Sequence, residues 1–209
     1  HQSHIRQRIC MLGIPEHEIT DSVEFALTAI LEKLDDTTKD LVRVREDFDE
    51  IERLVDVDCL APIPNRRAFM RQLHTAIASL ERYDHRCTIL YLDLNGFKRL
   101  NDTHGHAAGD AAIQHVSRIL MDAMRESDFV ARIGGDEFAV MMYHADAQSA
   151  NARGQAIAHM INMTPFIFQG KELLVNTAYG AYTLKKGDNA QSALASADFS
   201  MYVDKRRRR

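Results

Sequence analysis

The sequence has no tryptophan, and it holds only three cysteines and four prolines in 209 residues. Cys10, Cys59 and Cys87 lie far apart, without the paired spacing that chelates zinc. We therefore expect reduced, partly buried thiols and a reducing, cytoplasmic location.

Long hydrophobic runs are also missing. No apolar stretch approaches the ~20 residues that a membrane span requires, and no signal-peptide pattern opens the chain. We expect this segment to make no membrane contact. The chain begins at His1 rather than at a methionine, so we expect it to be part of a longer protein with a sensor domain upstream.

An excess of positive charge is absent as well. The net charge is −4 and the pI is near 6.2, whereas a general binder of nucleic-acid polymers or membrane surfaces is usually basic. A site for anionic nucleotides must therefore concentrate positive charge locally. What the chain does contain is 45% hydrophobic and 27% charged residues, the composition of a soluble protein with a real core.

A heptad pattern runs through the first quarter of the chain from Val23 onward. One seam position holds Leu27, Leu34, Leu41, Phe48 and Val55, and the other holds Val23, Ile30, Thr37, Val44 and Ile51. An apolar period of ~3.5 residues predicts a coiled coil, and with it a homodimer. The alternative is a helical hairpin that turns at residues 35–38. We favour one continuous helix, because a hairpin has no reason to keep the heptad phase across its turn.

The spacing of apolar residues changes after Asp58, where the heptad pattern no longer continues. We therefore divide the chain into an N-terminal helical segment for signalling and dimerisation at residues 1–57, with a further short helix at 1–12, and a second domain at residues 58–209. The patterns in the second domain predict helices at 66–80, 110–124, 147–163 and 190–205, and strands at 88–94, 129–133, 138–143, 166–168 and 173–182, the last two paired as a hairpin. Crossover helices mixed with hairpins predict an α+β fold: a mixed central sheet surrounded by helices, in the style of a split βαβ unit.

Acidic residues stand at two expected strand ends. Asp93 ends an apolar run, and Asp136 and Glu137 follow the turn Gly134-Gly135. Two glycines let a backbone approach a ligand closely, and carboxylates that converge on one spot suit Mg²⁺. Taken alone, a Gly-Gly-Asp is more often an ordinary polar turn.

Two longer motifs decide between these interpretations. The segment Asp93–Asp110 (DLNGFKRLNDTHGHAAGD) resembles the nucleotide-binding stretch of diguanylate cyclases. The segment Arg132–Phe138 (RIGGDEF) resembles the motif from which this GGDEF family takes its name. The resemblance covers residues 58–209 and implies a fold like that of nucleotidyl cyclases and polymerase palms.

The resemblance implies a role for each matching residue. Asp93, Asp136 and the carbonyl of Leu94 would hold Mg²⁺, with Mn²⁺ as an alternative. Asp136 would accept the proton of a 3′-hydroxyl with support from Glu137, and Lys98 would stabilise the developing charge. The substrate-binding residues implied in this way are Gly96, Phe97 and Lys98 along the phosphates, Asn101 and Asp110 at the guanine edge, His106 beside the nucleotide, Gly134 and Gly135 in the turn, and Lys205 and Arg209 at the outer phosphates.

A second site is implied by the same resemblance. Arg125 and Asp128 fit the RxxD pattern at which the family binds cyclic di-GMP as an inhibitor. An Arg fork suits a phosphate or a guanine face, and a carboxylate suits guanine N–H groups. In isolation, a solvated ion pair at a helix end would be the default interpretation of this pattern.

The chain departs from the family pattern where the two expected domains join. Ala61 and Pro62 stand where the family usually has Thr and Gly, which removes a hydroxyl and fixes a φ angle. The two substitutions lie at the joint through which the stalk would control activity.

The resemblance implies a diguanylate cyclase, a nucleotidyltransferase that condenses two GTP into cyclic di-GMP and two pyrophosphates across a homodimer. A coiled-coil stalk would raise the effective concentration of the second catalytic domain. The alternative is an inactive receptor that binds cyclic di-GMP through Arg125 and Asp128. An enzyme that makes another cyclic nucleotide is a third possibility.

Overall fold

The structure is a computed structural model that describes residues 20–207, and within them it describes the side chains outside 48–55 and 207. The helix expected at residues 1–12 lies outside the described residues. The chain divides into two compact units, residues 1–55 and residues 56–209, and each is described by itself.

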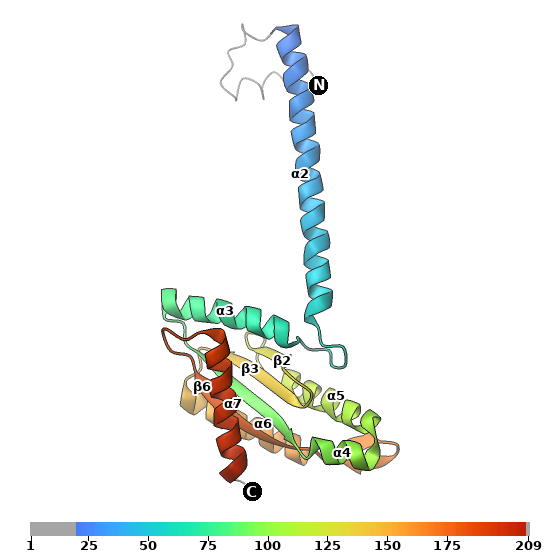
Figure 1. The fold of residues 1–209 in the computed structure, drawn as a ribbon, viewed down its shortest axis with the longest axis vertical. Helices are drawn as coiled ribbons and strands as arrows, with labels where there is room; N and C mark the ends of the chain where they lie inside the picture. Colours follow the sequence, from blue (N-terminus) through green and yellow to red (C-terminus); the bar gives the residue numbers. More distant parts are fainter. Residues whose placement is uncertain (1–19, 208–209) are drawn as a thin grey trace. The chain divides into compact units, whose positions relative to one another are not determined.

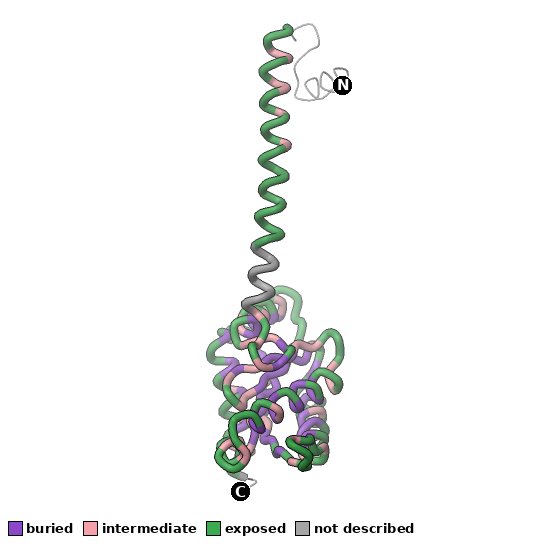
Figure 2. The backbone as a smooth tube through the Cα atoms, turned by 90° about the vertical axis from the view of Figure 1, so that its right-hand side faces the viewer, coloured by how far each residue is buried: buried purple, intermediate pink, exposed green. Residues whose placement is uncertain are grey.

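A single helix, α2 (Asp21–Asp56), makes up the described part of the first unit (Figure 1). The hairpin alternative is wrong, because the helix continues through its polar middle. Here the hydroxyls of Thr37 and Thr38 donate to the carbonyls of Lys33 and Leu34, 2.8 and 2.7 Å away and one turn back. Its seam residues from Ile30 to Val44 are exposed, Leu34 by 59% and Leu41 by 65%, whereas Val23 and Leu27 are half-buried. Figure 2 shows no buried residue along the described part of α2.

The second unit is built on a sheet of four strands. They are β1 (Cys87–Asn95), β2 (Phe129–Arg132), β3 (Glu137–Tyr143) and β6 (Asn176–Thr183), in the order β2-β3-β1-β6. Each pairing is antiparallel. Because β1 and β2 are both antiparallel to β3, they run in the same direction, and the chain crosses from one to the other through helices. Likewise, β3 and β6 are both antiparallel to β1, so they run in the same direction and a helix lies between them in the chain. The sheet therefore contains the expected split βαβ arrangement.

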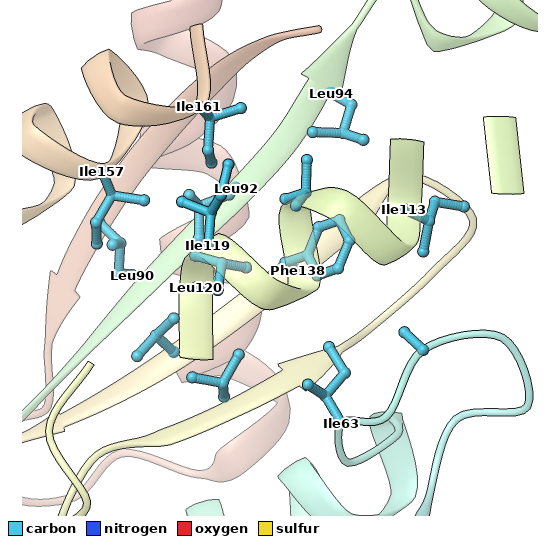
Figure 3. Packing of buried hydrophobic residues seen from close by; sticks show 14 of the residues in the cluster. Ile63, Leu90, Leu92, Leu94, Ile113, Ile119, Leu120, Phe138, Ile157 and Ile161 are labelled. Carbon is cyan, nitrogen blue, oxygen red and sulfur yellow. The ribbon is translucent and has the colours of Figure 1, made fainter. Parts of the chain in front are cut away.

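Helices cover both faces of this sheet. They are α3 (Arg66–Tyr83), α5 (His106–Ala123), α6 (Ala147–Met163) and α7 (Ala190–Arg207). Alternate residues of β1 serve the two faces. Leu90, Leu92 and Leu94 pack with α5 and α6 (Figure 3), whereas Ile89 and Tyr91 pack with α3 and α7. Burial on both faces explains why β1 reads as a continuous apolar run, and the α+β class is confirmed.

The last strands differ from the expectation. β4 (Phe166–Phe168) pairs with β5 (Lys171–Leu173) in a separate two-stranded sheet, and the chain then leaves this hairpin so that β6 can join β1. The predicted pairing of 166–168 with the whole of 173–182 is therefore wrong. A small residue in β6 permits its place under α7: a Cβ on Gly180 would lie 2.0 Å from the backbone nitrogen of Met201.

The joint at the start of the second unit is an ordered loop in spite of its unusual sequence. Asp58 and Ile63 share a backbone hydrogen bond of 2.9 Å, and Val57 forms a β-bridge with Pro64. Asn65 then caps α3 by accepting from the amide of Ala68 at 3.1 Å. The loop is therefore closed by its own backbone before α3 begins.

Two further results concern the helices. The short helix α4 (Phe97–His104) was not expected from the sequence. Within residues 20–207, every helix is too short or too polar to span a membrane.

Candidate active site

Three carboxylates meet where β1 ends beside the turn between β2 and β3. Asp93 lies opposite Glu137 in the β1–β3 register. The next residue, Leu94, donates its amide to the carbonyl of Asp136 at 3.1 Å. The pairing of two neighbouring strands therefore brings Asp93 together with Asp136 and Glu137. In the sequence, Asp93 precedes these two residues by 43 and 44 positions.

The Gly-Gly turn is shaped by Glu137. The amide of Ile133 donates to the Glu137 carbonyl at 2.8 Å, and the amide of Gly134 does so at 3.4 Å. A Cβ on Gly134 would lie 2.4 Å from the Glu137 carboxylate oxygen Oε2. The Glu137 carboxylate therefore packs directly against Gly134, and a larger residue at position 134 would displace it.

Arg132 fastens this turn to the joint. Its guanidinium donates to the Gly135 carbonyl, at 2.8 Å from Nη2 and 3.3 Å from Nε, and to Asp58 Oδ1 at 2.9 Å. The same Asp58 oxygen accepts from the amides of Leu60 and Ala61, at 3.0 and 2.9 Å. Burial alone would raise the pKa of Asp58, but the hydrogen bonds from Arg132 and the two amides outweigh it and lower the pKa. Sequence reasoning gave neither Asp58 nor Arg132 a role.

Burial and like charge act on the acidic residues themselves. Burial raises the pKa of Asp136, and the neighbouring Asp93 raises it further. Burial also raises the pKa of Glu137, although the nearby Tyr91 hydroxyl opposes the shift. A cation placed among these groups would relieve their repulsion.

The donors present suit a hard cation. Within residues 20–207, no group of three or more His, Cys, Asp or Glu side chains is arranged to hold a metal ion. The ligands expected from the sequence are fewer: the carboxylates of Asp93 and Asp136 and the backbone carbonyl of Leu94. Mg²⁺ is commonly held in this way, by one or two carboxylates with water and substrate phosphates completing its shell.

Lys205 of α7 reaches the same place. Its ammonium forms an ion pair with Asp93, and the two side chains are 24% and 14% exposed. It was expected at the outer phosphates of a nucleotide, whereas here it neutralises an expected metal ligand. Its expected companion, Arg209, lies outside the described residues.

The residues expected along the phosphates, beside the nucleotide and at the guanine edge lie at the start of α4, within α4 and on α5. Gly96 begins α4 with a φ of 73°, a conformation that glycine adopts without strain. Asn101 Oδ1 is buried and has no hydrogen-bond partner among the described residues. A Cβ on Gly109 would lie 2.0 Å from that oxygen, so glycine makes room for the amide. The remaining residues of this set (Lys98, His106 and Asp110) are exposed.

The RxxD pair lies in the connection between α5 and β2. Asp128 accepts from the amide of Arg125 at 3.2 Å and donates its own amide to the Arg125 carbonyl at 2.9 Å. Beside this turn is a pocket of about 440 Å³ that Arg125 and Asp128 line together with Tyr143, His144 and Arg153. No motif in the sequence pointed to Arg153, which comes from α6.

The chain thus has a split βαβ sheet in which adjacent strands bring Asp93, Asp136 and Glu137 together. Residues 55–209 match the family described as "Diguanylate cyclase, GGDEF domain". The chain belongs to this family.

Individual relatives agree with the assignment. The chain is 30% identical over 169 residues to a probable diguanylate cyclase of Escherichia coli, DgcE, covering 80% of this chain and 15% of that protein. It is 27% identical over 191 residues to the diguanylate cyclase DgcP of Pseudomonas aeruginosa, covering 91% of this chain and 28% of that protein. The chain thus spans less than a third of the length of either relative.

A solved structure has the same architecture. The coiled coil and GGDEF domain of DgcB from Caulobacter crescentus, solved in complex with c-di-GMP, superposes with a TM-score of 0.73 at 26% identity. The match covers 85% of this chain and 95% of that one.

Proposed function

We propose that this chain condenses two molecules of GTP into cyclic di-GMP and releases two molecules of pyrophosphate. The observation that carries the proposal is the meeting of Asp93, Asp136 and Glu137 where β1 ends beside the Gly-Gly turn. Relatives named as diguanylate cyclases support this activity.

The reaction is the attack of a 3′-hydroxyl on the α-phosphate of the other nucleotide. A P–O bond forms, and the bond to pyrophosphate breaks. Asp136 would take the hydroxyl proton, with Glu137 beside it as a second carboxylate. Burial, followed by the charge of Asp93, raises the pKa of Asp136, and a carboxylate with a raised pKa is the better proton acceptor.

Several groups would counter the negative charge of the phosphates. Asp93, Asp136 and the Leu94 carbonyl would hold Mg²⁺ or Mn²⁺, which when bound polarises the α-phosphate and makes the attacking hydroxyl more acidic. Lys98 would stabilise the charge that develops in transfer, and Lys205 would exchange its contact with Asp93 for the outer phosphates.

Selection of guanine would depend on α4 and α5. The unpaired oxygen of Asn101 is an acceptor, and so is the carboxylate of Asp110. Guanine offers N–H donors on the edge that these residues would face, whereas adenine presents a ring acceptor there. His106 and the backbone of Gly96 and Phe97 would lie along the nucleotide.

The reaction needs two catalytic domains that face each other, because each would bind one GTP. The uncovered seam of α2 supports a homodimer formed through a parallel coiled coil. An upstream sensor would act on this dimer, in keeping with the greater length of the relatives.

Product inhibition is part of the proposal. Cyclic di-GMP would bind at Arg125 and Asp128, and Arg153 would supply a second guanidinium to the same pocket. The complex of the similar DgcB domain with c-di-GMP supports a product site on this fold.

One experiment tests the activity and its rivals. The purified chain is incubated with GTP and Mg²⁺, with and without ATP, and the products are separated by chromatography. We expect cyclic di-GMP from the wild type and a loss of at least a hundredfold in Asp136→Asn. Absence of turnover, together with product binding that Arg125→Ala abolishes, would identify a receptor instead. A mixed product in the presence of ATP would identify a cyclase of different specificity.

A further inference from the structure

A wall of the pocket beside Arg125 and Asp128 is aromatic. Tyr143, the last residue of β3, is half-buried, and its hydroxyl accepts a hydrogen bond of 3.1 Å from Gln72 of α3. His144, the next residue, is exposed and lines the same pocket. Its imidazole is therefore a part of this wall that is open to a ligand.

The backbone of His144 has a conformation that few side chains adopt. Its φ is 55°, in the left-handed region that glycine enters without strain and other residues enter rarely. The amide of His144 donates to the carbonyl of Arg86 at 2.8 Å, which fixes the residue in this conformation. A side chain kept at such a position on the wall of a pocket indicates a role for that side chain.

The ring of His144 is oriented by a neighbouring ring. The centroids of the His144 and His85 rings lie 5.6 Å apart with their planes at 67°, which is an edge-to-face contact. His85 has contacts of its own: its Nδ1 lies 3.0 Å from the hydroxyl oxygen of Ser79, and its ring centroid lies 5.6 Å from that of Tyr83. A ring that is oriented in advance loses less freedom when a ligand binds.

The charged groups of the pocket match only part of a cyclic dinucleotide. The guanidiniums of Arg125 and Arg153 suit its phosphates, and the carboxylate of Asp128 suits the N–H groups of guanine. The flat faces of the bases also need partners, and aromatic side chains, histidine among them, stack on bases. His144 supplies such a ring in the same pocket.

We propose that His144 is a binding residue of this pocket, where its imidazole stacks on a guanine of cyclic di-GMP, and that His85 is the positioning residue for that ring. The inference rests on the proposed function, in which Arg125 and Asp128 bind the same ligand. It assigns recognition of the base face to a residue outside the RxxD pattern.

Calorimetric titration of the purified chain with cyclic di-GMP, without GTP, tests the role of the ring. His144→Asn removes the ring, and asparagine tolerates the left-handed conformation, so we expect binding about tenfold weaker than in the wild type. His144→Trp restores an aromatic ring and should bind within about threefold of the wild type. Wild-type affinity in His144→Asn, or equal weakening in both variants, would overturn the inference.

The absence of tryptophan from the sequence gives His144→Trp a second use. Its indole is the sole tryptophan side chain, and a purine that stacks on indole quenches its emission. We expect cyclic di-GMP to quench the emission of His144→Trp. His74→Trp is the control, because His74 is exposed on α3 and does not line the pocket. Unchanged emission in His144→Trp, or equal quenching in the control, would contradict stacking at position 144.

His85→Ala tests the positioning of the ring. We expect it to weaken binding about threefold in the wild-type chain and to cause no further loss when added to His144→Asn, since His85 acts through His144. Melting temperatures measured alongside show whether each variant is folded. Losses that multiply, or wild-type affinity in His85→Ala, would refute the role of His85.

Arg125→Ala distinguishes failure of the inference from failure of the proposed inhibitory site. Wild-type affinity for cyclic di-GMP in Arg125→Ala would refute the RxxD site. Wild-type affinity in His144→Asn, with binding abolished in Arg125→Ala, would refute only the role of His144. A wild-type chain that binds no cyclic di-GMP would refute both.

Discussion

Arg132 holds the carbonyl of Gly135 with two N–H groups, at 2.8 and 3.3 Å, while its third contact reaches Asp58 at 2.9 Å. One guanidinium therefore joins the loop that begins the second unit to the turn that carries Asp136. The planar fork of arginine makes this possible, and lysine, a point donor, cannot reproduce it.

We expect Arg132→Lys to lower kcat on the order of tenfold, because the turn that presents Asp136 loses its fixed carbonyl. Steady-state rates measured on chains of equal melting temperature check this expectation. Arg118→Ala, which removes an exposed guanidinium from α5, is the control and should keep the wild-type rate. A wild-type rate in Arg132→Lys would show that the turn is shaped without this contact.

Asp58 predicts how stability depends on pH. Its pKa is lowered in the folded chain by Arg132 and two amides, against the effect of burial, so the unfolded state binds its proton more tightly. The stabilisation is therefore complete above the ordinary pKa of ~3.9 and is lost as the pH falls through the lower folded value. We expect the difference in unfolding free energy between the wild type and Asp58→Asn to be constant from about pH 7 to pH 5 and to shrink below about pH 4. Urea titrations across this range measure it, and a difference that does not vary with pH would contradict the assignment.

Lys205 predicts opposite effects on two ligands. Its ammonium neutralises Asp93, so Lys205→Ala should bind Mn²⁺ about threefold to tenfold more tightly when no nucleotide is present. GTP should bind more weakly to the same variant, because a cation for its phosphates is missing. Mn²⁺ binding followed by electron paramagnetic resonance, and GTP binding followed by calorimetry, measure the two effects.

Lys186→Ala is the matched control for Lys205→Ala. Lys186 forms an exposed ion pair with Asp84 at 3.1 Å, where the side chains are 56% and 69% exposed. Its removal should leave both affinities unchanged. If Lys205→Ala weakened Mn²⁺ binding, the ammonium would be supporting the site rather than competing for it.

The seam of α2 predicts a dimer that depends on two leucines. Leu34 and Leu41 are 59% and 65% exposed, and glutamate at both positions should convert a dimer into a monomer at micromolar concentration. Cyclase activity should fall in parallel and recover as the protein concentration is raised. Val42→Glu, at a 53% exposed position outside the seam, is the control and should remain dimeric. Sedimentation velocity decides the matter, and an unchanged dimer in the double variant would refute a coiled coil through this seam.

Much of the fold could be predicted because its signals are local. The apolar run of β1 and the glycines between β2 and β3 mark these strands in the sequence, and α6 begins and ends at the predicted residues, Ala147 and Met163. The partners of β5 and β6 could not be predicted in this way. A continuous pattern over 173–182 does not reveal that the chain changes neighbours at residue 174, since that choice depends on which edge of the sheet is free.

The candidate site, too, has residues that the sequence predicts and contacts that it does not. Asp93, Asp136 and Glu137 were expected together because each is next to a strand or turn signal and because the two longer motifs around them resemble those of diguanylate cyclases. The contact of Arg132 with Asp58 spans 74 positions, and that of Lys205 with Asp93 spans 112. Such pairs are set by how helices and loops pack against the sheet. Neither composition nor spacing encodes them, so they emerge only in three dimensions.

Because Gly180 has no side-chain carbon, helix α7 packs closely on the sheet at this residue. Because the backbone of α7 rests directly on β6 at this residue, even a methyl group would act as a spacer under Met201. The C-terminal end of α7 would rise with it, and Lys205 would leave Asp93. The distance between Lys205 and Asp93 thus depends on Gly180, which has no functional group. A substitution of Gly180 would disturb the site without changing any residue in it.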